Sequence, residues 1–335
     1  MNSERKSAAA DMQPPGESVL RLSLTDRCNL KCSYCHVGNG HAAGEAHGKP
    51  NVLLPSIDAI MAQCGCVIEA FNVVKVRLTG GEPLVRRDVD EAVRRLKDFA
   101  PVRHVGITTN GQMLAAWAGR LKAAGVDSVN VSLDSLEPDR YAKITAGGDV
   151  GKVIAGIRSA KQAGIGMVKV NVVVLGGVND DELEDMIFFS MDEGIEVRFL
   201  ELMSFEGSSA MWERRFVSRE DILKRISQKF SVELLEDRKE QTAVMYGVKH
   251  GGRRAVAGII GSSDGHMCHA CNRIRISADG KLRRCLKDPL EIDLGRMIRA
   301  GCPGELIRES LRAYLDLKVR PAPLAGNGSM QRIGG

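Results

Sequence analysis

The chain has 335 residues, of which 44% are hydrophobic and 27% are charged, and its formal net charge is +5. This is ordinary globular composition, and it excludes long-range disorder and fibrous structures. The start of the chain has no apolar stretch typical of a signal peptide, and no apolar run approaches the roughly 20 residues of a membrane helix. We therefore expect a cytoplasmic protein.

The nine cysteines are the most informative residues, because clustered cysteines in a reducing compartment more often bind metal or do chemistry than form disulfides. Six of them form two groups, Cys28, Cys32 and Cys35, and Cys268, Cys271 and Cys285. The other three read as small buried side chains. The net positive charge is concentrated in residues 236–320, which hold 17 Lys and Arg against 11 Asp and Glu. It indicates either a solvated basic face or a site for an anionic ligand.

Residues 1–17 are polar and predict a flexible N-terminal arm. The following stretch, residues 18–230, alternates strand-like and amphipathic segments. The strand-like segments are Val19–Leu24, Lys75–Thr79, His104–Thr109, Val129–Asp134, Val168–Leu175 and Val197–Leu202. The helical segments include Ser56–Ala70, Val89–Phe99, Leu114–Ala124, Gly151–Ala163 and Asp180–Met191. This alternation predicts an α/β fold with a parallel sheet, an incomplete (β/α)6 TIM-like barrel, and a doubly wound sheet is the alternative.

The strands differ from those of an aliphatic-filled barrel because each keeps one polar face. Arg21 and Ser23 alternate with leucines, Lys75 and Arg77 alternate with valines, and Lys169 repeats the pattern. Successive side chains of a strand point to opposite faces, and the outer helices need the apolar one. We therefore expect a polar, basic lumen that binds a ligand; the alternative is that these residues are strand ends in water.

The pattern changes in residues 231–320, which predict a C-terminal α+β extension. Val232–Leu235, Ala243–Val248 and Arg254–Ile260 are typical of antiparallel strands. Two further strands, Ile274–Ile276 and Leu282–Leu286, flank a turn at Asp279–Gly280, and Pro303–Leu317 reads as a helix. Residues 321–335 end in Gly334–Gly335 and predict a flexible tail.

The first cysteine group, Cys28-x3-Cys32-x2-Cys35, directly follows the first strand, at the end where parallel sheets form ligand sites. Three thiolates leave one iron of a four-iron cluster open. A zinc site with His36 as the fourth ligand is the alternative.

This motif, with Tyr34 before its last cysteine, resembles the radical S-adenosylmethionine superfamily. The segment Thr79-Gly80-Gly81-Glu82-Pro83 strengthens the resemblance. It implies that S-adenosyl-L-methionine binds the open iron of a [4Fe-4S] cluster, and that Glu82 offers a carboxylate to its ammonium group. The cofactor contacts that it implies are Tyr34, Gly81, Ser132 and Met203.

The second group is Cys268-x2-Cys271-x13-Cys285. One interpretation is a zinc knuckle with His266 or His269 as the fourth ligand. The other is a second iron–sulfur cluster. If Cys271 and Cys285 share one centre, they must face the same side of the hairpin. A two-residue loop would turn Cys285 away, whereas a three-residue loop with Gly280 in the left-handed conformation pairs Cys285 with Arg273. We therefore predict the three-residue loop.

Together with Arg273-x-Arg275 and the Gly-Gly end, these motifs closely resemble the GTP 3′,8-cyclase family of molybdenum cofactor biosynthesis. The resemblance implies two [4Fe-4S] clusters, one for S-adenosyl-L-methionine and one for the guanine of GTP. It implies removal of hydrogen from C3′ of the ribose and attack of C3′ on guanine C8, to give (8S)-3′,8-cyclo-7,8-dihydroguanosine 5′-triphosphate.

Seven basic residues are candidate cavity cations without obvious internal partners: Arg21, Lys75, Arg77, Lys169, Arg198, Arg273 and Arg275. The same resemblance assigns the remaining site residues. Substrate-binding residues would be Arg21, Arg77, Thr108, Lys169, Arg198, Arg273, Ile274 and Arg275. Arg21, Arg273, Arg275, Gly334 and Gly335 would be catalytic. Arginine and lysine are the usual partners of phosphate groups.

Two other functions compete with this one. The first is a radical S-adenosylmethionine enzyme that acts on a peptide or RNA, although aromatic residues are only 4%, which argues against base stacking. The second is a structural zinc or iron–sulfur module. For the cyclase, the expected partners are GTP, a flavodoxin- or ferredoxin-type electron donor, the downstream cyclic pyranopterin monophosphate synthase and a second copy of the chain, with no nucleic acid and no membrane.

Overall fold

The computed structural model describes residues 18–35, 55–204, 209–236, 242–261, 271–286 and 290–316. The predicted N-terminal arm and Gly-Gly tail lie outside these ranges. One sheet contains all the strands described, in the order β12-β11-β10-β1-β2-β3-β4-β5-β6-β9-β8-β7. The strands are β1 (Ser18–Ser23), β2 (Val73–Thr79), β3 (His104–Thr109), β4 (Ser128–Ser132), β5 (Met167–Val174), β6 (Glu196–Glu201), β7 (Ser231–Leu234), β8 (Val244–His250), β9 (Arg253–Ile260), β10 (Arg273–Ile276), β11 (Lys281–Arg283) and β12 (Ile292–Asp293).

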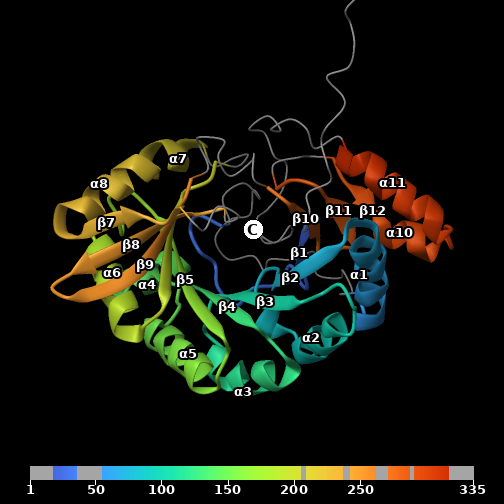
Figure 1. The fold of residues 1–335 in the computed structure, drawn as a ribbon, viewed down its shortest axis with the longest axis horizontal. Coiled ribbons are helices and arrows are strands. Elements are labelled where there is room, and N and C mark those ends of the chain that lie inside the picture. Colours follow the sequence, from blue (N-terminus) through green and yellow to red (C-terminus); the bar gives the residue numbers. More distant parts are fainter. Residues whose placement is uncertain are drawn as a thin grey trace, which may run out of the picture.

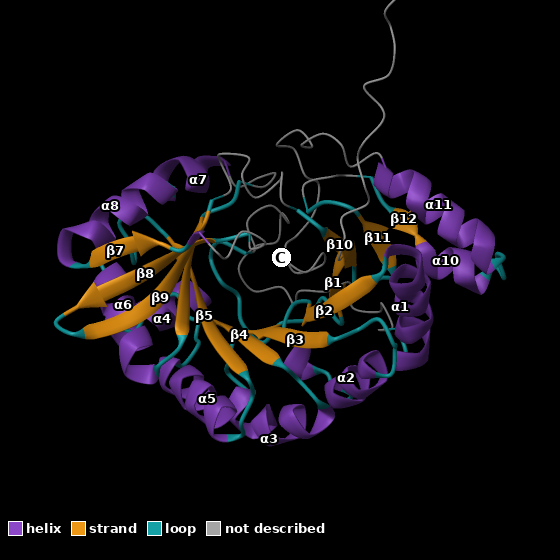
Figure 2. Cartoon of the chain, viewed as in Figure 1, coloured by secondary structure: helices purple, strands orange, loops and turns teal. Residues whose placement is uncertain are grey.

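The sheet curves into an open barrel, and the helices cover its outer, convex side (Figure 1; Figure 2). The helices are α1 (Ile57–Phe71), α2 (Val89–Lys97), α3 (Leu114–Ala124), α4 (Pro138–Thr145), α5 (Val150–Gln162), α6 (Leu183–Glu193), α7 (Ser209–Arg215), α8 (Arg219–Lys229), α10 (Leu294–Arg299) and α11 (Gly304–Asp316), with a short 3-10 turn η1 (Pro83–Val85). In the described part of the chain, no helix has both the length and the apolar character needed to cross a membrane.

The predicted parallel α/β barrel is confirmed, because β1 to β6 pair in sequence and in parallel. The strands after residue 230 do more than the sequence predicts. β8 is antiparallel to both β7 and β9 as expected, but β9 also pairs in parallel with β6, and β10 pairs in parallel with β1. The C-terminal segment thus adds three strands to each edge of the barrel, and the innermost strand on each side is parallel to its barrel neighbour.

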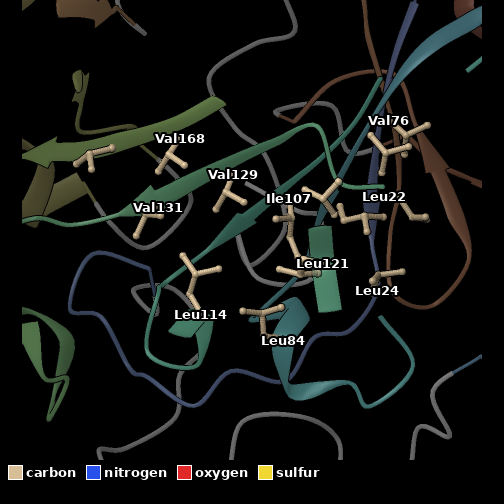
Figure 3. Packing of buried hydrophobic residues seen from close by; sticks show 14 of the residues in the cluster. Leu22, Leu24, Val76, Leu84, Ile107, Leu114, Leu121, Val129, Val131 and Val168 are labelled. Atoms are coloured by element: carbon tan, nitrogen blue, oxygen red, sulfur yellow. The ribbon is translucent and has the colours of Figure 1, made fainter. Parts of the chain in front are cut away.

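The two faces of the barrel strands separate as the alternation predicts. Leu22, Val76 and Ile107 are at most 1% exposed and pack against helix residues such as Leu121. Figure 3 shows these side chains meeting between sheet and helices. The burial of each such side chain contributes roughly 1.5–3 kcal/mol. The apolar face of the barrel strands therefore packs against the helices, and their polar face lines the lumen.

Local signals set the helix boundaries. Ser56 and Ser218 cap α1 and α8 by accepting a backbone N–H three residues on, and α3 ends at Gly125, which has a positive φ. Strand β11 is shorter than predicted, ending at Arg283. The sequence analysis did not single out α4, α7, α8, α10 or β12, each of which is short or outside the regular alternation.

Candidate active site

The first cysteine group lies in the loop that leaves β1 at its carboxyl end. Two backbone hydrogen bonds attach the middle of this loop to the end of α4: Lys31 N donates to Thr145 O (3.1 Å), and Ser33 N donates to Ile144 O (2.9 Å). Cys35 N donates to Cys32 O (3.0 Å), which tightens the loop at its last cysteine. The backbone of the loop is therefore fixed by the barrel itself.

The three thiols share one environment. Burial raises the pKa of the Cys35 thiol to about 12, and the neighbouring Cys28 adds to the shift. Burial likewise raises the pKa of Cys32, with Asp134, Cys35 and Cys28 adding to it. Neutral thiols are therefore favoured until a metal centre, which binds thiolates, occupies the site.

Three cysteine thiols match the ligand count of a four-iron cluster with one open iron. Within the described ranges, no three His, Cys, Asp or Glu side chains converge closely enough to hold one metal ion. Three cysteines that bind a four-iron cluster need converge less, because each thiolate binds a different iron. The residues present thus fit the cluster, and His36, the alternative zinc ligand, lies outside the described residues.

The Gly80-Gly81-Glu82-Pro83 turn packs directly on the cysteine loop. Gly81 N donates to Thr25 O (2.7 Å), and Glu82 N donates to Arg27 O (2.8 Å). A Cβ added at Gly81 would lie 2.1 Å from Arg27 O, so only glycine allows this approach. The paired glycines therefore position the backbone that leads into Cys28.

Glu82, whose carboxylate is predicted to meet the ammonium group of the cofactor, is 1% exposed. Oε1 accepts hydrogen bonds from Leu84 N (3.0 Å) and Thr109 Oγ1 (2.7 Å), and Oε2 accepts one from Asn110 N (2.7 Å). Burial raises the pKa of Glu82 to about 7 despite these bonds. Glu82 ties the turn to the end of β3, because its oxygens are already engaged there.

The predicted cofactor contacts lie around the same end of the barrel. Ser132 ends β4, Met203 follows β6, and both are half-buried. The Tyr34 hydroxyl donates to Asp134 Oδ2 (2.7 Å), and burial raises the pKa of Asp134 to about 6. Gly81 is also partly exposed, next to the cysteine loop.

Three arginines lie side by side in the lumen. Arg275 on β10, Arg21 on β1 and Arg77 on β2 are register partners across neighbouring strands. Burial, followed by Arg275, Arg273 and Arg77, lowers the pKa of Arg21 well below its usual value, and burial and then Arg273 lower the pKa of Arg275 to about 9. The row thus gathers positive charge on one face of the lumen.

The position of the Arg77 guanidinium is set by its neighbours. Its Nη1 donates to Ile107 O (3.3 Å) and to Asn130 Oδ1 (3.2 Å), and a Cβ added at Gly106 would lie 2.5 Å from Nη1. The guanidinium thus lies across β3 in the space that Gly106 leaves open. Thr108, a predicted substrate contact, is half-buried on the same strand and pairs in register with Asn130.

Lys169 and Arg198 were expected to have no internal partner, and this expectation is wrong. Glu196 Oε1 lies 3.1 Å from Lys169 Nζ and 2.6 Å from Arg198 Nη2, with all three side chains at most 13% exposed. Burial and Arg198 lower the pKa of Lys169 to about 8, although Glu196 acts in the opposite direction. The single negative charge of Glu196 therefore offsets only one of the two positive charges of Lys169 and Arg198.

The hairpin β10–β11 has the register that the three-residue loop predicts. Arg275 pairs with Arg283, and Gly280 has φ +80°. Continuing this register by two residues places Cys285 opposite Arg273. Arg273 Nε lies 3.5 Å from Cys271 Sγ, and Cys271 and Cys285 both raise the pKa of Arg275 against the larger lowering effect of burial. The two thiols thus lie near the same guanidinium, while Cys268 lies outside the described residues.

Ile274, predicted as a substrate contact, has its side chain in the hydrophobic core and is 3% exposed. Alternation along β10 places it on the helix side while its arginine neighbours face the lumen. Any contact with a lumen ligand would therefore come from its backbone.

The comparisons with known proteins agree with these motifs. The family model described as Radical SAM superfamily matches residues 22–190, and the model described as Molybdenum Cofactor Synthesis C matches residues 195–322. A GTP 3′,8-cyclase of Alkaliphilus oremlandii is 38% identical over 95% of this chain and 97% of its own. The chain belongs to the GTP 3′,8-cyclase family. Its membership implies a [4Fe-4S] cluster and S-adenosyl-L-methionine.

Other members of the cyclase family are equally similar. A GTP 3′,8-cyclase of Pelotomaculum thermopropionicum is 40% identical over 90% of this chain and 91% of its own, and the mitochondrial GTP 3′,8-cyclase of Arabidopsis thaliana is 36% identical over 90% and 75%. Among solved structures, Streptococcus suis SuiB bound to S-adenosylmethionine superposes with a TM-score of 0.59 at 12% identity, covering 89% of this chain and 68% of that one. This last likeness concerns the fold alone.

Several site residues escaped sequence reasoning. Glu196 had a signal, because it stands two residues before Arg198 on the same strand face and could have been paired with it. Asn130 had one too, as a polar residue on the lumen face. Gly106 had none, because its importance comes from Arg77, which is distant in sequence.

Proposed function

We propose that this chain is a GTP 3′,8-cyclase that converts GTP to (8S)-3′,8-cyclo-7,8-dihydroguanosine 5′-triphosphate, the first step of molybdenum cofactor biosynthesis. The observation that supports it most is the row of Arg275, Arg21 and Arg77 in the lumen. Three guanidinium groups in one row place a concentrated positive charge on the lumen face, which suits an anionic ligand. A nucleoside triphosphate is such a ligand, and guanidinium groups bind phosphate oxygens well.

The triphosphate would bind at Arg77, Lys169 and Arg198, on the lumen faces of β2, β5 and β6. Arg21, Arg273 and Arg275 would lie close to the ribose and the base, where they orient the substrate. Thr108 would complete this contact set.

The chemistry would occur at the carboxyl end of the barrel. Cys28, Cys32 and Cys35 would hold a cluster that, with S-adenosyl-L-methionine bound, supplies the one-electron chemistry that removes hydrogen from ribose C3′. The chain's own task is positioning: the turn at Gly81 and the hydrogen bond of Tyr34 fix the cysteine loop.

A second cluster on Cys268, Cys271 and Cys285 would bind the guanine, because three thiolates again leave one iron open. The extension of residues 231–320 would carry it. The Gly334–Gly335 tail would enter the cavity and assist cyclisation, a role that needs glycine flexibility.

The proposed partners follow from the reaction. An electron donor of the flavodoxin or ferredoxin type would reduce the first cluster, and the cyclic pyranopterin monophosphate synthase would take the product. We also propose a homodimer and a cytoplasmic location for the cyclase.

The decisive experiment is anaerobic reconstitution with iron, sulfide, S-adenosylmethionine and a reductant, with GTP or ATP added. We expect 5′-deoxyadenosine and the cyclised nucleotide in equal amounts with GTP, and neither in excess of background with ATP. Cleavage of S-adenosylmethionine with GTP left intact would exclude the cyclase and favour another substrate for the same radical chemistry.

A further inference from the structure

The cysteine loop is held at its two ends by two different buried carboxylates. At the Cys28 end, Glu82 fixes the glycine turn and accepts a hydrogen bond from the backbone N–H of Asn110. The side-chain amide nitrogen of Asn110 lies 3.8 Å from Cys28 Sγ. At the other end, Tyr34 stands between Cys32 and Cys35, and its hydroxyl reaches Asp134. Asp134, the carboxylate at this second end, has no role of its own in the chemistry described above.

Asp134 joins two separate elements. Its Oδ2 accepts the Tyr34 hydroxyl at 2.7 Å, and its Oδ1 accepts Val173 N on β5 at 2.8 Å. The residue is 2% exposed. Because each oxygen already has a partner, Asp134 is placed to act through Tyr34 rather than by touching a cofactor itself.

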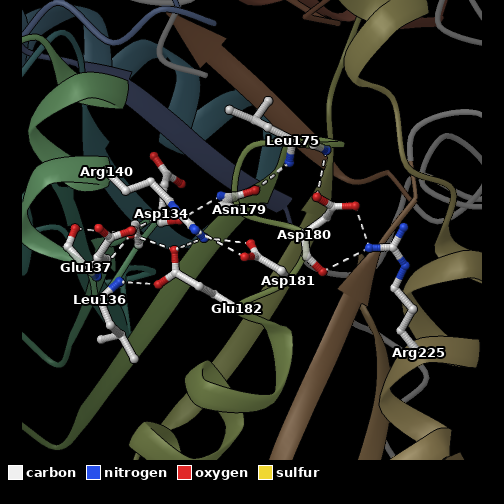
Figure 4. Close-up of polar contacts among 12 residues, drawn as sticks. Asp134, Leu136, Glu137, Arg140, Leu175, Asn179, Asp180, Asp181, Glu182 and Arg225 are labelled. Atoms are coloured by element: carbon white, nitrogen blue, oxygen red, sulfur yellow. Dashed lines mark hydrogen bonds and ion pairs between the residues drawn. The ribbon is translucent and has the colours of Figure 1, made fainter.

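A polar network around Asn179 and Glu182 holds the backbone of Asp134 and of the residues that follow it (Figure 4). Asn179 Nδ2 donates to Asp134 O (2.6 Å) and to Val173 O (2.9 Å), while Asn179 Oδ1 accepts Leu175 N (2.7 Å). The next residues of the β4–α4 loop are tied to Glu182, which accepts Ser135 Oγ at 2.7 Å. A fully paired buried network of this kind is rigid.

The Tyr34 ring is also held. It packs on the small apolar cluster of Ile144, Leu175 and Leu202. Its hydroxyl therefore has one fixed direction, toward Asp134, and the main chain on either side of it carries Cys32 and Cys35.

We propose that Asp134 is a positioning residue for the cluster: through the Tyr34 hydroxyl it sets the Cys32–Cys35 end of the loop on the barrel before a cluster binds. The inference rests on the cluster assignment of the first cysteine group and not on GTP as the substrate. A preorganised loop loses less conformational freedom when the cluster and S-adenosylmethionine bind.

The test compares Asp134→Asn, Tyr34→Phe and the double variant with Asp181→Asn. Asp181 is a matched control, because it belongs to the same network but is 67% exposed and contacts only the Arg140 side chain in the described part of the chain. In the apo-protein, hydrogen exchange of residues 28–35 should become roughly tenfold faster in both single variants, the scale of one charge-assisted hydrogen bond. It should stay unchanged in the control.

The double variant should exchange no faster than the more affected single variant, because both changes break one bond. In the reconstituted enzyme, the KM for S-adenosylmethionine should rise severalfold while the KM for GTP stays the same. Unchanged exchange in Tyr34→Phe, additive effects in the double variant, or an equal rise in both KM values would each overturn the proposal. If GTP proves not to be the substrate, the exchange result still decides it, since it needs neither cluster nor nucleotide.

Discussion

At the scale of single residues, the lumen makes room for Arg77 by leaving out a side chain beside it. Gly106 provides the space that the guanidinium occupies, since an added Cβ would lie 2.5 Å from Nη1. A glycine inside a strand weakens it, so this position is explained by the neighbouring arginine and not by the sheet.

We expect Gly106→Ala to fold normally but to bind GTP roughly tenfold more weakly. The new methyl group would displace the Arg77 guanidinium, the flexible end of a side chain, and break its bonds to Ile107 O and Asn130 Oδ1. Calorimetric titration with GTP measures the loss. Gly119→Ala in α3 is the control, because nothing lies within 4 Å of its added Cβ; it should leave GTP binding unchanged and raise stability by about 0.5–1 kcal/mol. Wild-type affinity for GTP in Gly106→Ala would show that GTP binding does not depend on the position of the Arg77 guanidinium beside Gly106.

His104 predicts a pH dependence of the empty enzyme. Its Nε2 lies 2.8 Å from Ser128 Oγ, and burial, Lys75 and Arg77 lower the pKa of His104 from 6.5 to about 4. Between these values the unfolded chain binds a proton that the folded chain does not. Stability should therefore fall as the pH drops from about 6.5 toward about 4.

Urea unfolding of the wild type and His104→Gln at pH 7 and pH 5 measures this contribution. The wild type should lose more stability than the variant over that interval. Equal losses would show that the histidine does not titrate in the folded lumen as its surroundings require.

At the scale of elements, the β10–β11 hairpin shows how one residue of loop length decides which way a cysteine points. A shift of one residue in a hairpin moves every side chain to the other face. The three-residue loop, with Gly280 at φ +80°, gives the register that aligns Cys285 with Arg273 on the lumen side. Sequence reasoning reached this register only because it required three sulfurs at one centre.

Deletion of Ala278 should shorten the loop to Asp279–Gly280 and turn Cys285 away from Cys271. We expect the reconstituted variant to lose one cluster's iron, about half of the total, while the first cluster keeps its electron paramagnetic resonance signal. Ala278→Gly keeps the loop length and should keep both clusters. Full iron content in the deletion variant would show that the second group does not depend on this register.

At the scale of the whole molecule, the C-terminal segment completes both edges of the barrel. β9 covers the outer edge of β6, and β10 covers that of β1, so the strands from residues 18–230 would otherwise have two unpaired edges. Exposed edges of this length are prone to aggregation. The two parts of the chain therefore form one sheet.

A chain truncated after residue 230 should consequently be insoluble or unfold without a cooperative transition. Removal of Gly334 and Gly335 alone is the control, and it should leave the melting temperature unchanged because it removes no residue of the described strands. Thermal unfolding followed by circular dichroism distinguishes the two outcomes. A soluble, cooperatively folded 1–230 fragment would show that the barrel is stable without its added edge strands.

The sequence by itself determined the parallel barrel, the polar lumen and the two cysteine groups. Each of these is encoded by local spacing: a period of two along strands, a longer period along helices, and three cysteines within a few residues. The tertiary structure decided which residues serve the site from a distance. Glu82 binds the cysteine loop to β3, Asp134 holds Tyr34, and Gly106 admits Arg77, because burial and close approach depend on segments far apart in the chain that the barrel brings together.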